Sequence, residues 1–162
     1  MRPTIADINS YKYQRSYRWH FLLRDADSKH ALSTLCESTK LPTISGNTPL
    51  TATLHGINVI QPARRNYSGS INLTFFDDDK HLVLKEFYQY VSPYRKPGNE
   101  MVWKKTPNIV LSLLDANENE TMRYELKNWF AESIQQGDAN SEGGVMKITV
   151  TIKYCDFDLS SV

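Results

Sequence analysis

The fold is decided by residues 70–91, which read SINLTFFDDDKHLVLKEFYQYV. The first seven of these residues alternate in polarity, and this period of two predicts a strand with one buried face. The buried face of this strand is expected to carry Ile71, Leu73 and Phe75. After three aspartates the apolar period becomes helical, and a helix is predicted over about residues 79–91. The apolar positions of this helix are Leu84, Phe87, Tyr88 and Val91.

Two strands are predicted on the N-terminal side of this stretch. From Tyr17 to Leu23, aromatic and apolar residues alternate with mainly polar ones, which is typical of a half-buried strand. A second strand is expected over Ala31–Ser38, and residues 25–29 between the two supply turn-forming side chains. The spacing predicts that the two strands pair as a hairpin.

The C-terminal half contains a further predicted hairpin and a last strand. Residues 108–114 and 121–126 are predicted strands, joined by the turn sequence DANEN at 115–119. Residues 128–144 lack a clear period and contain several glycines, so they are expected to be irregular. From Val145 the residues alternate again, which predicts a final strand.

An extended loop and hairpin are predicted over about residues 43–63. Small and turn-forming residues come first, and the segments LTATL at 50–54 and INVI at 57–60 then predict two strands joined near His55 and Gly56. Two long strands that project from a small domain need a partner for their exposed edges. The candidate subunit contacts are Leu50, Thr51, Thr53, His55, Ile57, Val59 and Ile60.

Length and composition place the chain among globular proteins of one domain. It has 162 residues, a formal net charge of +1 and no stretch that approaches the roughly 18 apolar residues of a membrane span. The near-neutral charge gives no electrostatic indication of a nucleic-acid partner. The N-terminus lacks the continuous apolar region of a secretion signal, so Cys36 and Cys155 are expected to be free thiols that behave as small core residues.

These elements together predict a mainly β protein of the α+β type. We expect an antiparallel β-sandwich or partly closed barrel of about seven or eight strands, with one flanking helix. Residues 17–162 form this single domain, and residues 1–16 form an N-terminal arm that packs on another surface or stays mobile.

Residues that carry chemistry are few. The triplet Asp77-Asp78-Asp79 is interpreted as a helix cap, with Asp77 and Asp78 as the capping residues, because acidic side chains favour a helix N-terminus. The alternative is a small metal-dependent β-barrel enzyme that uses the three carboxylates. The four histidines are scattered, and no metal-protease, nucleophile-elbow or phosphate-loop pattern is present. No metal, cofactor or catalytic residue is therefore expected.

A third hypothesis concerns Tyr11 to Arg18, where aromatic and basic residues interleave. Such a stretch resembles a stacking platform for single-stranded nucleic acid. Aromatic residues are equally typical of strands and of protein interfaces, so an arm or edge-strand role is favoured.

The order of the segments resembles the tail-tube proteins of contractile bacteriophages, which are related in fold to the haemolysin-coregulated proteins of type VI secretion. The resemblance covers roughly Tyr17 to Phe157. It rests on a series of segments in a fixed order: FLL at 21–23, TKLP at 39–42, INV at 57–59, INLTFFDD at 71–78 with the following helix, NIVLSLLD at 108–115, YELKNW at 124–129 and ITVTIKY at 148–154.

By this resemblance, six copies form a ring, and rings stack into a tube in a phage tail that is assembled in the host cytoplasm. The segment from Thr43 to Ala63 is then expected to contact neighbouring subunits and rings, and DNA passes through the lumen without specific binding. Sheath, baseplate hub and tape-measure proteins are the implied partners. A tube-initiating ring protein of the baseplate is the alternative. Candidates for the lumen wall are Asn72, Thr74, Thr149 and Thr151.

Overall fold

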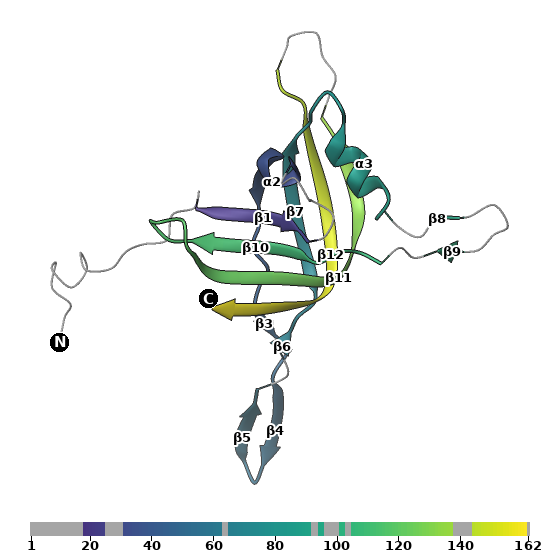
Figure 1. The fold of residues 1–162 in the computed structure, drawn as a ribbon. Coiled ribbons are helices and arrows are strands. Elements are labelled where there is room, and N and C mark those ends of the chain that lie inside the picture. The colour runs from purple at the N-terminus through teal and green to yellow at the C-terminus, as the bar shows by residue number, and fades with distance from the viewer. Residues whose placement is uncertain are drawn as a thin grey trace.

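A six-stranded antiparallel sheet forms the body of the protein (Figure 1). The computed structural model describes residues 18–24, 31–62, 65–91, 94–95, 101–102, 105–137 and 144–161. The strand order is β1-β10-β11-β12-β7-β2. The bounds are Trp19–Leu23 for β1, Cys36–Thr39 for β2, Gly69–Phe76 for β7, Ile109–Leu114 for β10, Glu120–Gln136 for β11 and Lys147–Ser161 for β12.

The two long strands, β11 and β12, bend near their middles and take part in both halves of the sheet (Figure 1). Their pairing is interrupted between Lys127↔Asp156 and Trp129↔Tyr154. Asn128, in this interruption, has a φ of 49°, a left-handed conformation that asparagine tolerates better than most residues. The first half of β12 pairs with β7, whereas its second half runs beside the part of β11 that pairs with β10. The bend therefore folds one sheet into a nearly closed barrel.

The core lies between the two halves of this sheet. Phe75 of β7 meets the ring of Phe21 edge-on at 5.5 Å and the ring of Phe87 at 5.4 Å. Trp129 packs against Phe87 and Tyr90, and its indole N–H donates to the carbonyl of Pro107. Burial of these large rings supplies much of the apolar area removed from water, which is the main favourable contribution to folding.

Two helices lie at one end of the barrel (Figure 1). The helix α3 spans Leu82–Tyr88, within the predicted range, and its buried side chains are Val83 and Phe87. Tyr88, which was predicted on the apolar face, is 73% exposed, so this part of the prediction was wrong. A short helix, α2, spans Ala31–Leu35 and leads directly into β2.

Residues 45–61 of the predicted segment, together with Arg65 and Asn66, form a narrow ribbon that projects from the body (Figure 1). Its outer part is the hairpin of β4 (Leu50–Leu54) and β5 (Ile57–Gln61). Its base is the short pair of β3 (Ser45–Gly46) and β6 (Arg65–Asn66). A further two-stranded pair joins β8 (Tyr94–Arg95) to β9 (Met101–Val102).

The mainly β antiparallel architecture is confirmed, but further sequence predictions were wrong. Residues 31–35, predicted as strand, form the helix α2. Residues 31–38 do not form a hairpin with the first strand, because β1 pairs with β10 and β2 pairs with β7. Residues 128–144 are not all irregular, because β11 continues to Gln136. Interruptions of the pairing at Asn128 and at Glu132 shift which residues face inward, so the period of two is lost from the sequence although the strand continues. The arm at 1–16 lies outside the described residues.

Candidate functional site

The outward side of β2, β7, β12 and the second half of β11 carries short uncharged polar side chains. Strand register places Ser38, Thr74, Thr149 and Gln135 in one row, and Asn72, Thr151 and Ser133 in the next. These side chains are exposed or half-buried. We call this surface the neutral polar face. The four residues predicted from sequence for a lumen wall, Asn72, Thr74, Thr149 and Thr151, lie together at its centre.

Two ion pairs lie at opposite ends of the neutral polar face. Lys147 Nζ is 2.7 Å from Glu37 Oε1, and Lys153 Nζ is 2.6 Å from Glu132 Oε1. The Lys147 ammonium also lies 5.3 Å from the centre of the Phe76 ring. Both lysines project from β12, and each is neutralised by an acid from a different strand. Neither glutamate was predicted from the sequence.

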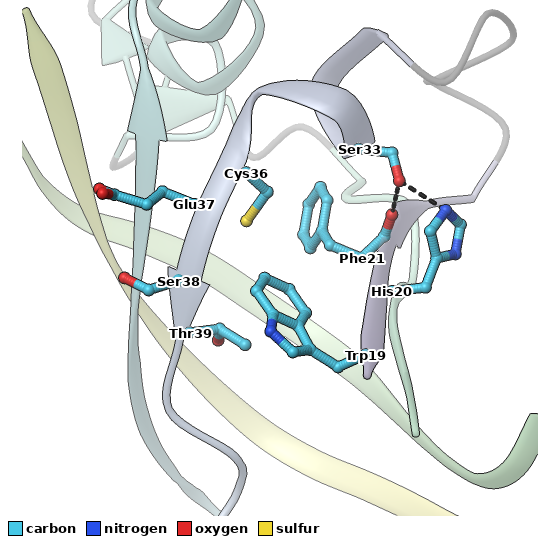
Figure 2. Close-up of a pocket in the computed structure, with 8 residues that line it drawn as sticks. All are labelled: Trp19, His20, Phe21, Ser33, Cys36, Glu37, Ser38 and Thr39. Carbon is cyan, nitrogen blue, oxygen red and sulfur yellow. Dashed lines mark hydrogen bonds between the residues drawn. The ribbon is translucent and has the colours of Figure 1, made fainter. Parts of the chain in front are cut away.

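Both glutamates occupy irregular positions in their strands. The register changes between Cys36 and Ser38 on β2, which makes Glu37 an extra residue. Figure 2 shows Glu37 and Ser38 on the side of β2 away from Trp19, whereas Cys36 and Thr39 point toward it. The register changes again between Ala131 and Ser133 on β11, where Glu132 is the extra residue. A bulge of this kind re-aims a side chain, and here each bulge directs a carboxylate to a lysine.

The opposite half of the sheet presents a different outer surface. There, the first half of β11 carries charged side chains in close pairs. Glu125 pairs at 3.3 Å with Arg24, which follows β1, and Arg123 pairs with Glu120 at 2.6 Å. The hydrogen bond from Arg123 lowers the pKa of Glu120. Lys127 contacts Asp158 on the same surface. The two outer surfaces of the barrel are thus chemically distinct, one dense in charge and the other neutral.

The projecting hairpin has one mainly apolar face. Residues opposite each other in an antiparallel pair share a face, so Leu50, Ala52, Ile57 and Val59 lie on one side. Leu50 and Ile57 are each 68% exposed. Thr51, Thr53 and Ile60 lie on the other side, where Thr53 and Asn58 are hydrogen-bonded at 2.8 Å. His55 is in the turn, with a φ of 50°. The structure therefore divides the predicted contact residues between two faces.

A pocket lies between β1 on one side and α2 and β2 on the other (Figure 2). β1 and β2 are the two edge strands of the sheet. Trp19, Phe21 and Cys36 line its floor, and burial raises the pKa of the Cys36 thiol to about 12. Ser33 Oγ lies 2.7 Å from His20 Nε2, a pairing also found in hydrolases. Here, however, the Ser33 hydroxyl donates its single hydrogen to the Phe21 carbonyl, so His20 must be the donor. The pair joins α2 to β1 and does not activate a nucleophile.

Asp77 and Asp78, two of the three aspartates before α3, have structural partners. Asp78 Oδ1 accepts a 2.8 Å hydrogen bond from the backbone N–H of Leu82, the first residue of the helix. Asp77 Oδ2 lies 2.8 Å from Nδ1 of His81, while its Oδ1 is buried and has no hydrogen-bond partner. Among the described residues, no group of three or more histidine, cysteine or acidic side chains is arranged to hold a metal ion.

The remaining sequence predictions concern the two cysteines and the N-terminal segment. Cys36 and Cys155 are both free, but Cys155 is exposed, so its prediction as a core residue was wrong. In the hypothetical nucleic-acid stretch, Tyr11 to Tyr17 lie outside the described residues. Within the part of the chain that the structure describes, no helix has the length and apolar character needed to cross a membrane.

Comparison with known structures identifies relatives of the same fold. The tube-terminating cap of the anti-feeding prophage superimposes with a TM-score of 0.71 and 14% identity over 98% of each chain. A chain of the extended sheath-tube complex of the extracellular contractile injection system PVC gives a TM-score of 0.68 and 15% identity over 99% of this chain and 100% of the other. A type six secretion system protein gives 0.50 and 10% over 84% and 78%.

Sequence comparisons then supply the family. No curated protein sequence matches the chain. The sequence profile described as phage tail tube protein matches residues 4–160, which is nearly the whole chain. On this match the protein belongs to the phage tail tube protein family, whose members are structural components of tails.

Proposed function

We propose that this chain is the subunit of the tube of a contractile phage tail, that six copies form a ring, and that stacked rings enclose a lumen through which DNA passes. The observation that carries this proposal is the exposed apolar face of the projecting hairpin. An isolated two-stranded ribbon is marginally stable in water, and a contiguous exposed apolar surface is typical of a contact site. A neighbouring copy in the same or the next ring is the occupant that family membership favours.

The neutral polar face is the proposed wall of the lumen. It offers hydroxyl and amide groups without net charge, and a conduit for DNA must avoid tight contacts with phosphates. The edge strands β1 and β2 support ring formation, because closure of a ring pairs or covers edges that a monomer leaves open. Sheath, baseplate hub and tape-measure proteins are the proposed partners. The role is structural, and the proposal includes no enzymatic reaction.

Electron microscopy of the concentrated purified protein tests this function. Rings that stack into tubes are the expected result, and Ile57→Glu should abolish them because it places a charge on the apolar face of the hairpin. Val145→Glu is the control, since Val145 is 66% exposed and lies outside the hairpin. Circular dichroism establishes that both variants fold. A protein that stays monomeric at all concentrations, or tubes that form equally well with Ile57→Glu, would contradict the proposal.

Single rings that never stack would favour a different position in the same tail. A tube-initiating ring of the baseplate needs one face that matches another protein, whereas a tube subunit needs two faces that match each other. The resemblance in fold to a chain of the anti-feeding prophage baseplate, with a TM-score of 0.58, supports this second candidate. Stacked and unstacked rings are readily distinguished in the same images.

A further inference from the structure

We propose that Glu37 and Glu132 are charge-neutralising residues of the lumen wall, which cancel Lys147 and Lys153 so that nucleic acid passes the neutral polar face without being retained. This inference rests on the proposed function, because it takes the neutral polar face as the wall of the lumen. Both acids lie outside regular strand pairing. Their proposed role is to counteract the attraction between the lysine side chains and the phosphates of nucleic acid.

The charge balance of this face is local. Its seven central side chains are hydroxyls and amides, so they do not compensate the charge of a lysine. Lys147 and Lys153 are about half exposed, and six residues of extended strand place them about 20 Å apart. Without acids, two ammonium groups would face the same surface of a duplex and form contacts with its phosphates.

The position of the two acids indicates that the pairing is specific. Neither Glu37 nor Glu132 has a cross-strand partner in the register, yet each carboxylate reaches the lysine nearest to its bulge. Regular pairing would give each acid a fixed neighbour on the adjacent strand. Two separate strands therefore use the same device, a bulge that carries a glutamate, to neutralise two lysines of one strand.

The test measures binding of a labelled DNA duplex to the full chain at two salt concentrations. The variant Glu37→Gln/Glu132→Gln keeps the size and hydrogen-bonding capacity of both side chains but frees both lysines. We expect it to bind DNA more tightly than the wild type at 50 mM salt. Two new phosphate contacts make the salt slope steeper by about 1.8, so the gain should fall about 12-fold between 50 and 200 mM.

Two further variants test whether the gain comes from the two lysines of this face. Asp158→Asn frees Lys127 on the charged surface, where Glu125 and Asp156 still lie close to that lysine, and it should give no comparable gain. Adding Lys147→Gln and Lys153→Gln to the double glutamate variant should restore the weak binding of the wild type. No gain in the double variant, an equal gain with Asp158→Asn, or a gain that survives removal of the lysines would each overturn the inference.

Electron microscopy and nuclease digestion of the same samples separate this inference from the proposed function. DNA binding is measured on unassembled protein, so it does not depend on tube formation. If the wild type forms tubes but the double variant binds DNA no more tightly than the wild type, only this inference is overturned. A wild type that forms neither rings nor tubes overturns the proposed function. In tubes of the double variant, retained DNA that resists nuclease supports a lumen position for this face, and DNA that is digested contradicts it.

Discussion

Glu37 and Lys147 form an ion pair of 2.7 Å although 110 residues separate them in the chain. The pair joins β2 to β12 across β7, which lies between them in the sheet. It is one of two ion pairs on a surface whose central side chains are uncharged and polar. Charge on this surface is therefore controlled by contacts that exist only in the folded protein.

The two ion pairs of the neutral polar face should contribute little to stability. Both are about half exposed, and exposed pairs of this kind contribute about 0–1 kcal/mol. Thermal unfolding of Glu37→Gln/Glu132→Gln should therefore give a midpoint within a few degrees of the wild type. A large loss of stability would mean that the two bulges need the ion pairs to form.

Replacement of Phe75 should strongly destabilise the fold. Its side chain is fully buried between Phe21 and Phe87, so Phe75→Ala removes two ring contacts and leaves a cavity. Losses of this type cost about 3–5 kcal/mol. Denaturant unfolding measures the change, and Phe76→Ala on the opposite face of the same strand is the control. Similar losses for the two variants would contradict the assignment of the two faces.

Gly69 is predicted to be intolerant of a side chain. A methyl group at this position would lie 2.5 Å from the Tyr154 hydroxyl oxygen and 2.9 Å from Cζ of that ring, and Tyr154 is buried. Gly69→Ala forces the ring to move, and overpacking of this kind costs about 1–3 kcal/mol. Gly46→Ala is the matched control, because a methyl group there meets no atom within 4 Å. Equal unfolding midpoints for the two variants would contradict this prediction.

The turn between β10 and β11 should weaken in acid. Asp115 accepts hydrogen bonds from the backbone N–H groups of Asn119 and Asn117, and these bonds lower its pKa below the usual 3.8. A carboxyl with a lowered folded pKa stabilises the fold above pH 3.8, and this contribution is lost as the pH falls through the folded value. Unfolding of Asp115→Asn, which keeps a neutral acceptor, should be less pH-dependent in that window. Titration of the carboxyl by NMR at or above 3.8 would refute the prediction.

The two thiols should differ in reactivity. Burial raises the pKa of Cys36 from 9.0 to about 12, which reduces its thiolate fraction about a thousandfold at neutral pH. Cys155 is exposed. A maleimide reagent should therefore label one thiol per chain rapidly in the native state and two after denaturation, and Cys155→Ser should remove the rapid phase. Rapid labelling of the Cys155→Ser variant in the native state would show that the pocket at Cys36 is open.

The local sequence pattern was sufficient to predict those elements in which apolar residues keep one regular spacing throughout. The strand at β7, the helix after it and the hairpin of β4 and β5 follow from alternation, helical spacing and turn residues, all of which act between near neighbours. The strand over residues 128–136 was missed for a physical reason. At Asn128 and at Glu132 the pairing is interrupted, and beyond each interruption the other set of alternate residues faces the core. Such an irregularity leaves no regular pattern in the sequence of a single strand.

Strand pairing across long separations was decided by the tertiary structure. The sequence favoured a hairpin of neighbouring segments at 17–23 and 31–38, but a short helix intervenes, and each strand finds a distant partner instead. Cross-strand packing and burial select these partners, and neither is encoded in local spacing.

The candidate surfaces divide in the same way. Sequence alone identified the exposed hairpin and the four polar residues of β7 and β12, because alternation assigns Asn72, Thr74, Thr149 and Thr151 to outward positions. Only the folded sheet brings the four together and places Glu37 and Glu132 beside Lys147 and Lys153. Charge neutrality of a surface is a sum over residues from distant segments, so it is determined by the register of the strands and not by the order of residues along one of them.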